Sequence, residues 1–204
     1  MSNDEPLVLP EGDWTLMPRP RVAPAVRSSL GLLPRGLLWL TRRRTGERGD
    51  FNVLLTLARL GKLFPVHAIF LSQLLGKTRL TAAEKEIVVL RVAWRLGCAY
   101  EYSHHHRMAI ELGVAADRIA AATTPNVEAF APRLAALLVA SDELVGQHKL
   151  SDAGWQALRK HCTDEEALEL CMFVGHYVMI AMIINTAGVQ PEPRFAVVAH
   201  GQNR

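Results

Sequence analysis

Four side chains that can transfer protons or electrons lie in one short stretch of the sequence: Glu86, Cys98, Glu101 and His105. A carboxylate one helical turn from an imidazole can orient that ring and stabilise its charge near neutral pH, which suits general acid–base chemistry. A thiol becomes reactive toward oxidants when it ionises. The residue types therefore indicate proton transfer by the two carboxylates and the imidazole, thiol chemistry at the cysteine, or both.

The first part of this stretch is predicted to be a helix over residues 81–96. Thr81 and Glu84 have the spacing of a capping box, which satisfies the first backbone amides of a helix. Within the helix, Glu86 shares a face with Leu90 and faces the core, where a carboxylate is unfavourable unless it is paired. The opposite face is expected to be solvated and carries Glu84, Arg91 and Arg95.

The second part is predicted to be a helix over residues 98–112, with Cys98, Glu101 and His105 on one core-facing stripe. Glu101 and His105 are four residues apart and can hydrogen-bond directly. Cys98 begins its helix after a glycine, where the helix dipole favours a thiolate. The stripe therefore places a thiol, a carboxylate and an imidazole side by side.

Purely structural interpretations of the same residues remain open. A buried Glu and His can simply satisfy each other, and cysteine is often buried without being reactive. Glu101 and His105 could supply two ligands of a Zn or Fe site, with Glu86 or His176 as a third. No metal ligand set and no cofactor is nevertheless assigned. His176 is expected to be a satisfied core histidine.

Two further histidines, His104 and His106, point about 100° away from His105 on a helix and are expected at the surface or at a subunit interface. Cys162 and Cys171 lack nearby basic partners and are expected to be inert.

Helical periodicity accounts for most of the remaining chain, so the fold class is all-α. Eight helices are expected, with Pro65 separating the first two and a second capping box, Thr163 with Glu166, at the start of the last. They cover residues 52–60, 66–75, 81–96, 98–112, 115–122, 132–148, 151–160 and 163–184, and a short strand is conceivable at 195–198. Prolines up to Pro34 predict an extended N-terminal arm over residues 1–50, before a helical domain at 51–191 and a tail at 192–204.

Composition limits the setting in which the protein works. The 204 residues are half hydrophobic, and three cysteines without paired spacing argue against a disulfide scaffold. No apolar run is expected to reach the roughly 18 to 20 residues of a membrane helix. A soluble, cytoplasmic protein is expected, with no membrane or nucleic acid partner. The basic run Arg42 to Arg44 could bind a membrane surface or a nucleic acid, or its segment could wrap a partner subunit. The interpretation as a packing arm is favoured.

The chain resembles the alkylhydroperoxidase D-like family in a segment that begins at Glu84 and reads EKEIVVLRVAWRLGCAYEYSHHHRMAIELGV. The family motif has a Glu before a Cys-x-x-Cys and a His after it. NVLLTLAR from Asn52 and NTAGVQ from Asn185 resemble flanking segments of carboxymuconolactone decarboxylase family proteins. Together these similarities span roughly Phe51 to Pro191 and imply an alkylhydroperoxidase D-like helical domain that assembles as a dimer, trimer or hexamer.

Residue by residue, the resemblance implies that Glu86 is the relay Glu, Cys98 the first Cys and His105 the relay His. Glu101 stands where the second Cys would be. In family members with both thiols, the resemblance implies that the second attacks peroxide and the first resolves the sulfenic acid as a disulfide. This chain lacks the second thiol, so the dithiol cycle is not expected.

Three functions remain open on this basis. One is a single-Cys peroxidase that uses Cys98 and an external thiol. The second is an acid–base enzyme in which Glu86, Glu101 and His105 decarboxylate or isomerise a small lactone or oxo acid, and it suits the residues better because a carboxylate cannot reduce a peroxide. The third is a non-catalytic oligomeric binding protein that uses the pocket or the basic arm.

Overall fold

Helices form nearly all of the regular structure in the part of the chain described by the computed structural model, which is residues 5–46, 49–76 and 78–200. The side chain of Arg44, in the basic run, lies outside the described part. The helices are α1 (Leu32–Thr45), α2 (Asn52–Ala58), α3 (Leu63–Leu74), α4 (Ala82–Arg95), α5 (Ala99–Glu111), α6 (Ala116–Ala121), α7 (Pro132–Gln147), α8 (Asp152–Arg159) and α9 (Asp164–Ala187). The prediction of an all-α fold is confirmed.

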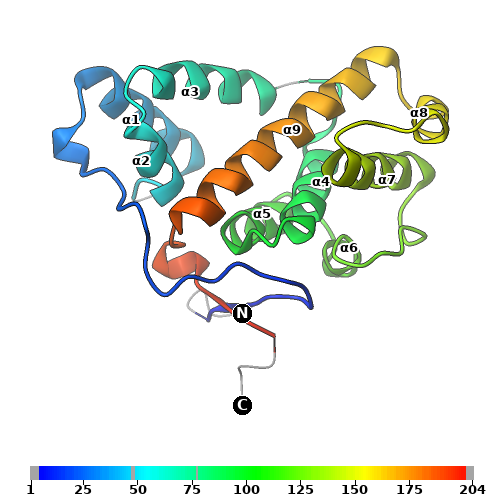
Figure 1. The fold of residues 1–204 in the computed structure, drawn as a ribbon, viewed down its shortest axis with the longest axis horizontal. Coiled ribbons are helices and arrows are strands. Elements are labelled where there is room, and N and C mark those ends of the chain that lie inside the picture. Colours follow the sequence, from blue (N-terminus) through cyan, green and yellow to red (C-terminus); the bar gives the residue numbers. More distant parts are fainter. Residues whose placement is uncertain (1–4, 47–48, 77, 201–204) are drawn as a thin grey trace.

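Helix α9 runs through the middle of the molecule and carries much of the core (Figure 1). It packs against α4 and α7, while α4 and α5 pack against each other. Leu170, Phe173 and Val174 of α9 are each at most 1% exposed. Helices α4 and α5 follow each other in the chain, and their packing brings together the two halves of the segment from Glu86 to His105.

The length and apolar composition of α9 correct one expectation from the sequence. This helix is long and apolar enough to cross a membrane, but half of its most apolar window is buried inside the fold. Its three acidic residues in the first turn, Asp164, Glu165 and Glu166, lie where the helix dipole favours negative charge. A core helix meets the same criteria of length and composition, so α9 by itself does not indicate a membrane span.

Both predicted capping boxes are present. The Thr81 side chain accepts a hydrogen bond from the Glu84 amide, and Thr163 does the same for Glu166. The boundary predicted at Pro65 is wrong, because Pro65 lies inside the first turn of α3, where its missing amide has no helical partner to lose.

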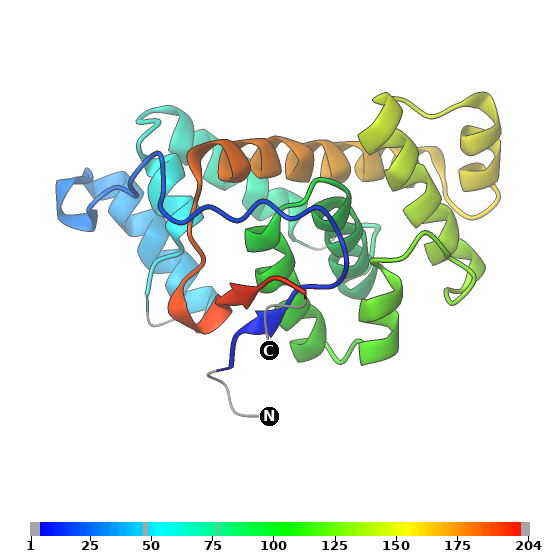
Figure 2. The ribbon, with the colours of Figure 1, turned by 60° about the horizontal axis from the view of Figure 1, so that its bottom comes forward.

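The N-terminal arm is extended only in its first part. Pro34 lies in the first turn of α1, a position that tolerates proline, so the segment expected to be extended instead forms a helix over Leu32–Thr45. Before that helix, the N-terminal strap (residues 9–26) crosses the helical domain beneath α9 and α5 (Figure 2). The expected short strand is present as β2 (Val197–Val198), paired in parallel with β1 (Leu7–Val8).

Backbone hydrogen bonds attach the strap to the ends of the site helices. The Thr15 amide donates to the Gly97 carbonyl at 2.8 Å, and the Arg21 amide donates to the Ala187 carbonyl at 2.8 Å. Gly97, between α4 and α5, has φ +59°, and a Cβ on it would overlap the Asp13 carbonyl oxygen. Glycine is therefore required where the strap crosses the turn that joins the two site helices.

Candidate active site

The centre of the site is a hydrogen-bonded His–Glu pair between two neighbouring helices. His105 Nδ1, on α5, lies 2.7 Å from Glu86 Oε2, on α4, and both residues are buried. The carboxylate accepts from the Nδ1–H, which leaves Nε2 as the nitrogen able to take a proton. The core-facing charge that seemed out of place at Glu86 is thus explained by its partner.

Glu101 does not bond to His105 as its spacing suggested. Both carboxyl oxygens of Glu101 are buried, and within the described structure the Cys98 thiol is the one polar side-chain group close to them. Burial raises the pKa of Glu101 from 4.5 to about 8, with the nearby Cys98 thiol offsetting part of the rise. Glu101 is therefore a neutral carboxylic acid at neutral pH, able to donate a proton or a hydrogen bond.

Cys98 lies behind this arrangement and is completely buried. Desolvation raises the pKa of the Cys98 thiol well above its usual value, and the nearby Glu101 carboxyl raises it further. The expectation that a helix dipole would favour the thiolate is therefore wrong, because burial outweighs the dipole. All three cysteines are free.

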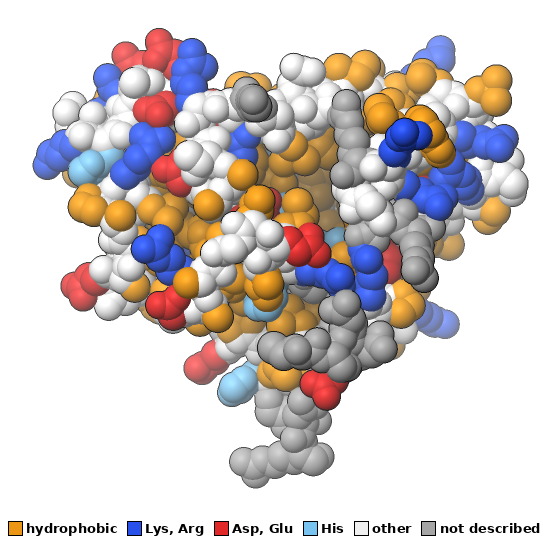
Figure 3. All heavy atoms as spheres, turned by 180° about the vertical axis from the view of Figure 1, so that it is seen from behind, with side chains coloured by type: hydrophobic (Ala, Val, Ile, Leu, Met, Phe, Trp, Pro, Cys, Tyr) orange, Lys and Arg blue, Asp and Glu red, His pale blue; other side chains and the backbone are white. Residues whose placement is uncertain are grey.

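An apolar cavity of about 190 Å³ joins the site residues and is here called the site cavity. Helices α1, α2, α3, α5 and α9 supply its walls. The molecular surface seen in Figure 3 is hollowed, with hydrophobic side chains gathered around the hollow. The residues that line the site cavity are Thr41, Thr45, Phe51, Val53, Leu54, Leu57, His67, Leu71, Leu75, Tyr100, Glu101, His104, His105, Met108, His176, Tyr177, Ile180 and Ile184.

The lining includes Glu101 and His105 but excludes the other two candidate residues. Glu86 lies behind His105 and borders a different depression, while Cys98 borders neither. The structure thus brings an acid and an imidazole to one cavity, supports the imidazole with Glu86, and keeps the thiol away from the cavity.

Two histidines that line the cavity were not among the candidate catalytic residues, although His176 had been considered as a possible third metal ligand. His67, on α3, stacks on His176, on α9, with ring centroids 5.3 Å apart. Both ring nitrogens of His67 and Nδ1 of His176 are buried without a hydrogen-bond partner in the described structure. His176 was expected to be a satisfied core histidine, and the prediction that it is satisfied is wrong. An unexplained His on each of two apolar helices was the only signal available.

His104 was expected at a surface or an interface but is buried at the base of the site cavity. Its ring lies between those of Tyr100 and Phe195, with centroids 4.3 Å and 3.8 Å away. His104 Nε2 lies 2.8 Å from Glu192 Oε2, and Tyr100 donates a hydrogen bond of 3.0 Å to the same carboxylate. The C-terminal segment therefore packs against two residues that line the cavity, His104 and Tyr100.

Arg91 was also misplaced by the sequence analysis. It is 2% exposed, and its guanidinium makes two hydrogen bonds to Asp142, at 2.9 Å and 2.6 Å. Arg91 therefore ties α4 to α7, and the supposed solvated face of α4 is partly an interface. Among the described residues, no group of three or more His, Cys, Asp or Glu side chains is arranged to hold a metal ion.

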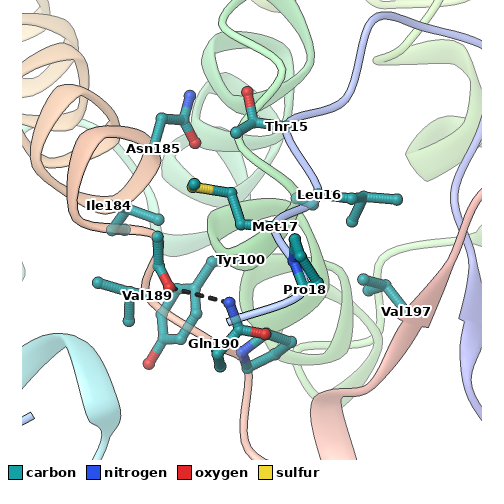
Figure 4. Close-up of a pocket in the computed structure, with 13 residues that line it drawn as sticks. Thr15, Leu16, Met17, Pro18, Tyr100, Ile184, Asn185, Val189, Gln190 and Val197 are labelled. Atoms are coloured by element: carbon teal, nitrogen blue, oxygen red, sulfur yellow. Dashed lines mark hydrogen bonds between the residues drawn. The ribbon is translucent and has the colours of Figure 1, made fainter. Parts of the chain in front are cut away.

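A second cavity, of about 390 Å³, lies between the N-terminal strap and the end of α9 (Figure 4). Met17 from the strap points toward Ile184 and Asn185, and Gln190 donates to the Gly188 carbonyl at 2.9 Å. Of the residues that line the site cavity, this one contains only Tyr100 and Ile184. It includes none of the four candidate residues, so the chemistry is assigned to the site cavity.

The carboxymuconolactone decarboxylase family model matches residues 68–142, which include all four candidate residues. None of the curated proteins compared with the chain matches it. Among solved structures, an uncharacterized peroxidase-related protein from Ralstonia eutropha JMP134 with an alkylhydroperoxidase AhpD core is 24% identical. The match has a TM-score of 0.74 and covers 88% of this chain and 95% of that one.

Two other solved structures have the same fold. A peroxidase-related protein from Silicibacter sp. TM1040 is 18% identical with a TM-score of 0.70, and the match covers 93% of this chain and 96% of that one. The debrominase Bmp8 is 17% identical with a TM-score of 0.70, and the match covers 85% of this chain and 93% of that one. At these identities the likeness establishes the fold alone.

Proposed function

We propose that this chain belongs to the alkylhydroperoxidase D and carboxymuconolactone decarboxylase superfamily, whose decarboxylase model matches residues 68–142, and that it is an enzyme that moves a proton on a small uncharged substrate. One observation carries the proposal: a neutral acid, Glu101, and a carboxylate-bound imidazole, His105, line the same apolar cavity. Environments that make one group an acid and another a base are typical of proton-transfer sites.

The first step is abstraction of a proton from a carbon next to a carbonyl group. Nε2 of His105 takes the proton, and the electron pair of the C–H bond moves to form a C=C bond while the carbonyl π electrons move to oxygen. Glu101 gives its proton to that oxygen, so the product of this step is a neutral enol. Stabilisation of the developing negative charge by a proton donor in a dry site lowers the barrier.

The second step returns both protons and completes an isomerisation. In a substrate with a second C=C bond next to the reacting carbon, the enol is a conjugated dienol; the imidazolium of His105 delivers its proton to the far carbon of that bond, whose π electrons shift toward the ring carbon that lost its proton, and Glu101 recovers its proton as the carbonyl re-forms. Throughout the cycle the Glu86 carboxylate, 2.7 Å from Nδ1, orients the ring and stabilises its charged form. Glu86 does not line the cavity and acts through His105 as a positioning residue.

The cavity favours a lactone over an oxo acid as the substrate. Within the described structure, no Lys or Arg lines the cavity, so a substrate carboxylate would be buried without a cation beside a second acid. The volume of about 190 Å³ is somewhat larger than an apolar cavity of roughly 150 Å³ that accepts benzene. A single-ring, uncharged carbonyl compound fits these limits.

The superfamily's peroxidase chemistry is less well supported here. A peroxidatic cysteine must meet its oxidant as a thiolate. Cys98 is fully buried, does not line the cavity, and has a raised pKa. Of the similar proteins, the debrominase Bmp8 was also solved as a cysteine-to-alanine variant in complex with 2,3,4-tribromopyrrole, so a small ring is bound by another protein of this fold.

The test is proton exchange on unsaturated five-membered lactones in D₂O, followed by ¹H NMR. Wild type is expected to accelerate exchange at the carbon next to the carbonyl. His105→Gln and Glu101→Gln should each lower the rate by at least about 100-fold, the usual contribution of a general acid or base. His161→Gln, at an exposed histidine, should keep the wild-type rate.

Two outcomes would contradict the proposal. If wild type gives no exchange above the buffer rate, or if His105→Gln exchanges as fast as wild type, the site is not a proton-transfer site and a binding function becomes the better account. The peroxidase assignment replaces ours if two results hold together: mass spectrometry of peroxide-treated wild type shows sulfenic acid at Cys98, and Cys98→Ser loses the peroxide-consuming activity.

A further inference from the structure

The stacked pair His67 and His176 leaves three buried ring nitrogens without partners, although it lines an otherwise apolar cavity. We infer that this pair is a second polar contact of the site cavity and holds a hydroxyl or carbonyl group on the side of the ligand away from the reacting carbon. The inference rests on the proposed use of the cavity and adds the residues that would select its substrate.

An unsatisfied polar group in a protein interior is destabilising, and native structures contain few of them. His176 is 5% exposed and lies on the central helix, with Phe70 and Tyr177 against its ring. No described side chain bonds to Nδ1 of His176 or to either nitrogen of His67. Residues that served packing alone would be more stable as phenylalanine or leucine, so two such histidines together point to a ligand.

The position of Tyr177 places the histidine pair near the catalytic residues. Its ring makes an edge contact with His105, with centroids 5.1 Å apart, and another with His176, with centroids 5.3 Å apart. His105 and His176 therefore both contact one aromatic ring. A ligand about one ring in size can contact both through the cavity that all four residues line.

The pair is suited to a neutral partner. Burial lowers the pKa of His67, and burial together with the charges of His67 and His105 lowers the pKa of His176 to about 4. Each ring is therefore neutral at pH 7, with one nitrogen donating and the other accepting. A hydroxyl group both donates and accepts, so it complements a neutral imidazole better than a carboxylate does.

The ligand class that follows is an uncharged single ring with oxygen atoms at two separate positions. One oxygen would accept from protonated Glu101, and the other would bond to His67 or His176. Resorcinol serves as a probe of this class, toluene as the matching ring without oxygen, and benzoate as the charged ring.

The experiment measures the affinity of the three probes by calorimetry at pH 7, with and without EDTA. Wild type is expected to bind resorcinol at least about tenfold more tightly than toluene, because hydrogen bonds to buried polar groups are satisfied. Benzoate should bind most weakly. His176→Phe and His67→Phe should lose the preference for resorcinol and retain toluene, while His161→Phe, at an exposed position, should behave as wild type.

Thermal unfolding distinguishes a binding role from a structural one. His176→Phe should melt at the same or a higher temperature, because it removes unpartnered polar atoms, and His176→Asn should recover part of the resorcinol preference. Equal affinity of wild type for resorcinol and toluene overturns the inference, as does a lower melting temperature with unchanged affinities. Resorcinol binding that EDTA abolishes also overturns it, in favour of a metal bound by the pair.

These results can be separated from those of the exchange assay. Probe binding needs no turnover, so failure of lactone exchange would remove the proposed function and leave the ligand contact standing. Loss of the resorcinol preference alone would remove the ligand contact and leave the proton-transfer assignment intact.

Discussion

The buried acid Glu101 should make the stability of the protein fall as the pH rises from about 5 to 8. Its pKa is raised from 4.5 to about 8 by burial, so between these values the folded protein holds a proton that the unfolded chain has lost. Stability contributed by a raised pKa is fully present below the lower value and is lost as the pH rises through the higher one. Glu101→Gln removes this titration while keeping a similar shape.

The size of the effect follows from the shift. Each pH unit inside the window changes the free energy of unfolding by about 1.4 kcal/mol, so wild type should lose on the order of 4 kcal/mol relative to Glu101→Gln between pH 5 and pH 8. Above pH 8 the two stability curves should run parallel. Other groups titrate equally in both proteins, and their effects cancel in the difference.

Urea unfolding at pH 5, 6, 7 and 8, followed by circular dichroism, measures that difference. Glu111→Gln is the matched control, because Glu111 is an exposed carboxylate on the same helix, and its difference from wild type should stay flat with pH. A difference for Glu101→Gln that does not grow between pH 5 and 8 would refute the reasoning. Glu101 would then be charged in the folded protein, and its role as a proton donor would fail.

Two further predictions concern the scaffold that holds the site. Gly97→Ala should destabilise the protein by at least about 2 kcal/mol more than Gly113→Ala in urea unfolding. Both glycines have positive φ, but of the two only Gly97 would bring a Cβ against the strap. Equal losses of stability would mean that the strap does not pack against Gly97. Asp142→Asn should lower the free energy of unfolding by about 3 kcal/mol, because the buried guanidinium of Arg91 loses its carboxylate partner. Arg95 is a half-exposed partner of the same carboxylate, so Arg95→Ala should change the free energy of unfolding by less than about 1 kcal/mol. Similar losses for the two variants would contradict the assignment of the buried pair.

Local patterns predicted most of the helices because each signal is contained within a few residues. Thr81 with Glu84 and Thr163 with Glu166 marked two helix starts correctly, since capping depends only on a side chain and a backbone amide three residues away. Pro34 misled the analysis because proline is compatible with a first helical turn, and nothing local distinguishes that position from an extended arm.

The site was only half predictable for a related reason. Periodicity placed Glu86 and His105 on core-facing stripes, but the stripes do not say which helices meet. Within one helix, Glu101 seemed the natural partner of His105, and only the packing of α4 on α5 gives that place to Glu86. His67 and His176 lie more than one hundred residues apart in the sequence, so their stacking depends entirely on the tertiary fold.

Glu101, which stands where the family resemblance would place a second thiol, accounts for much of the site's character. A thiol is readily buried in an apolar environment, whereas burial of the Glu101 carboxyl group raises its pKa. The neighbouring Cys98 thiol is pushed the same way, toward its protonated form. A buried carboxyl group is destabilising and is therefore expected where function requires it. A neutral acid that titrates near pH 8 can serve proton transfer, whereas it cannot take part in thiol redox chemistry. The carboxyl group of Glu101 therefore supplies a proton donor to the same cavity that His105 lines.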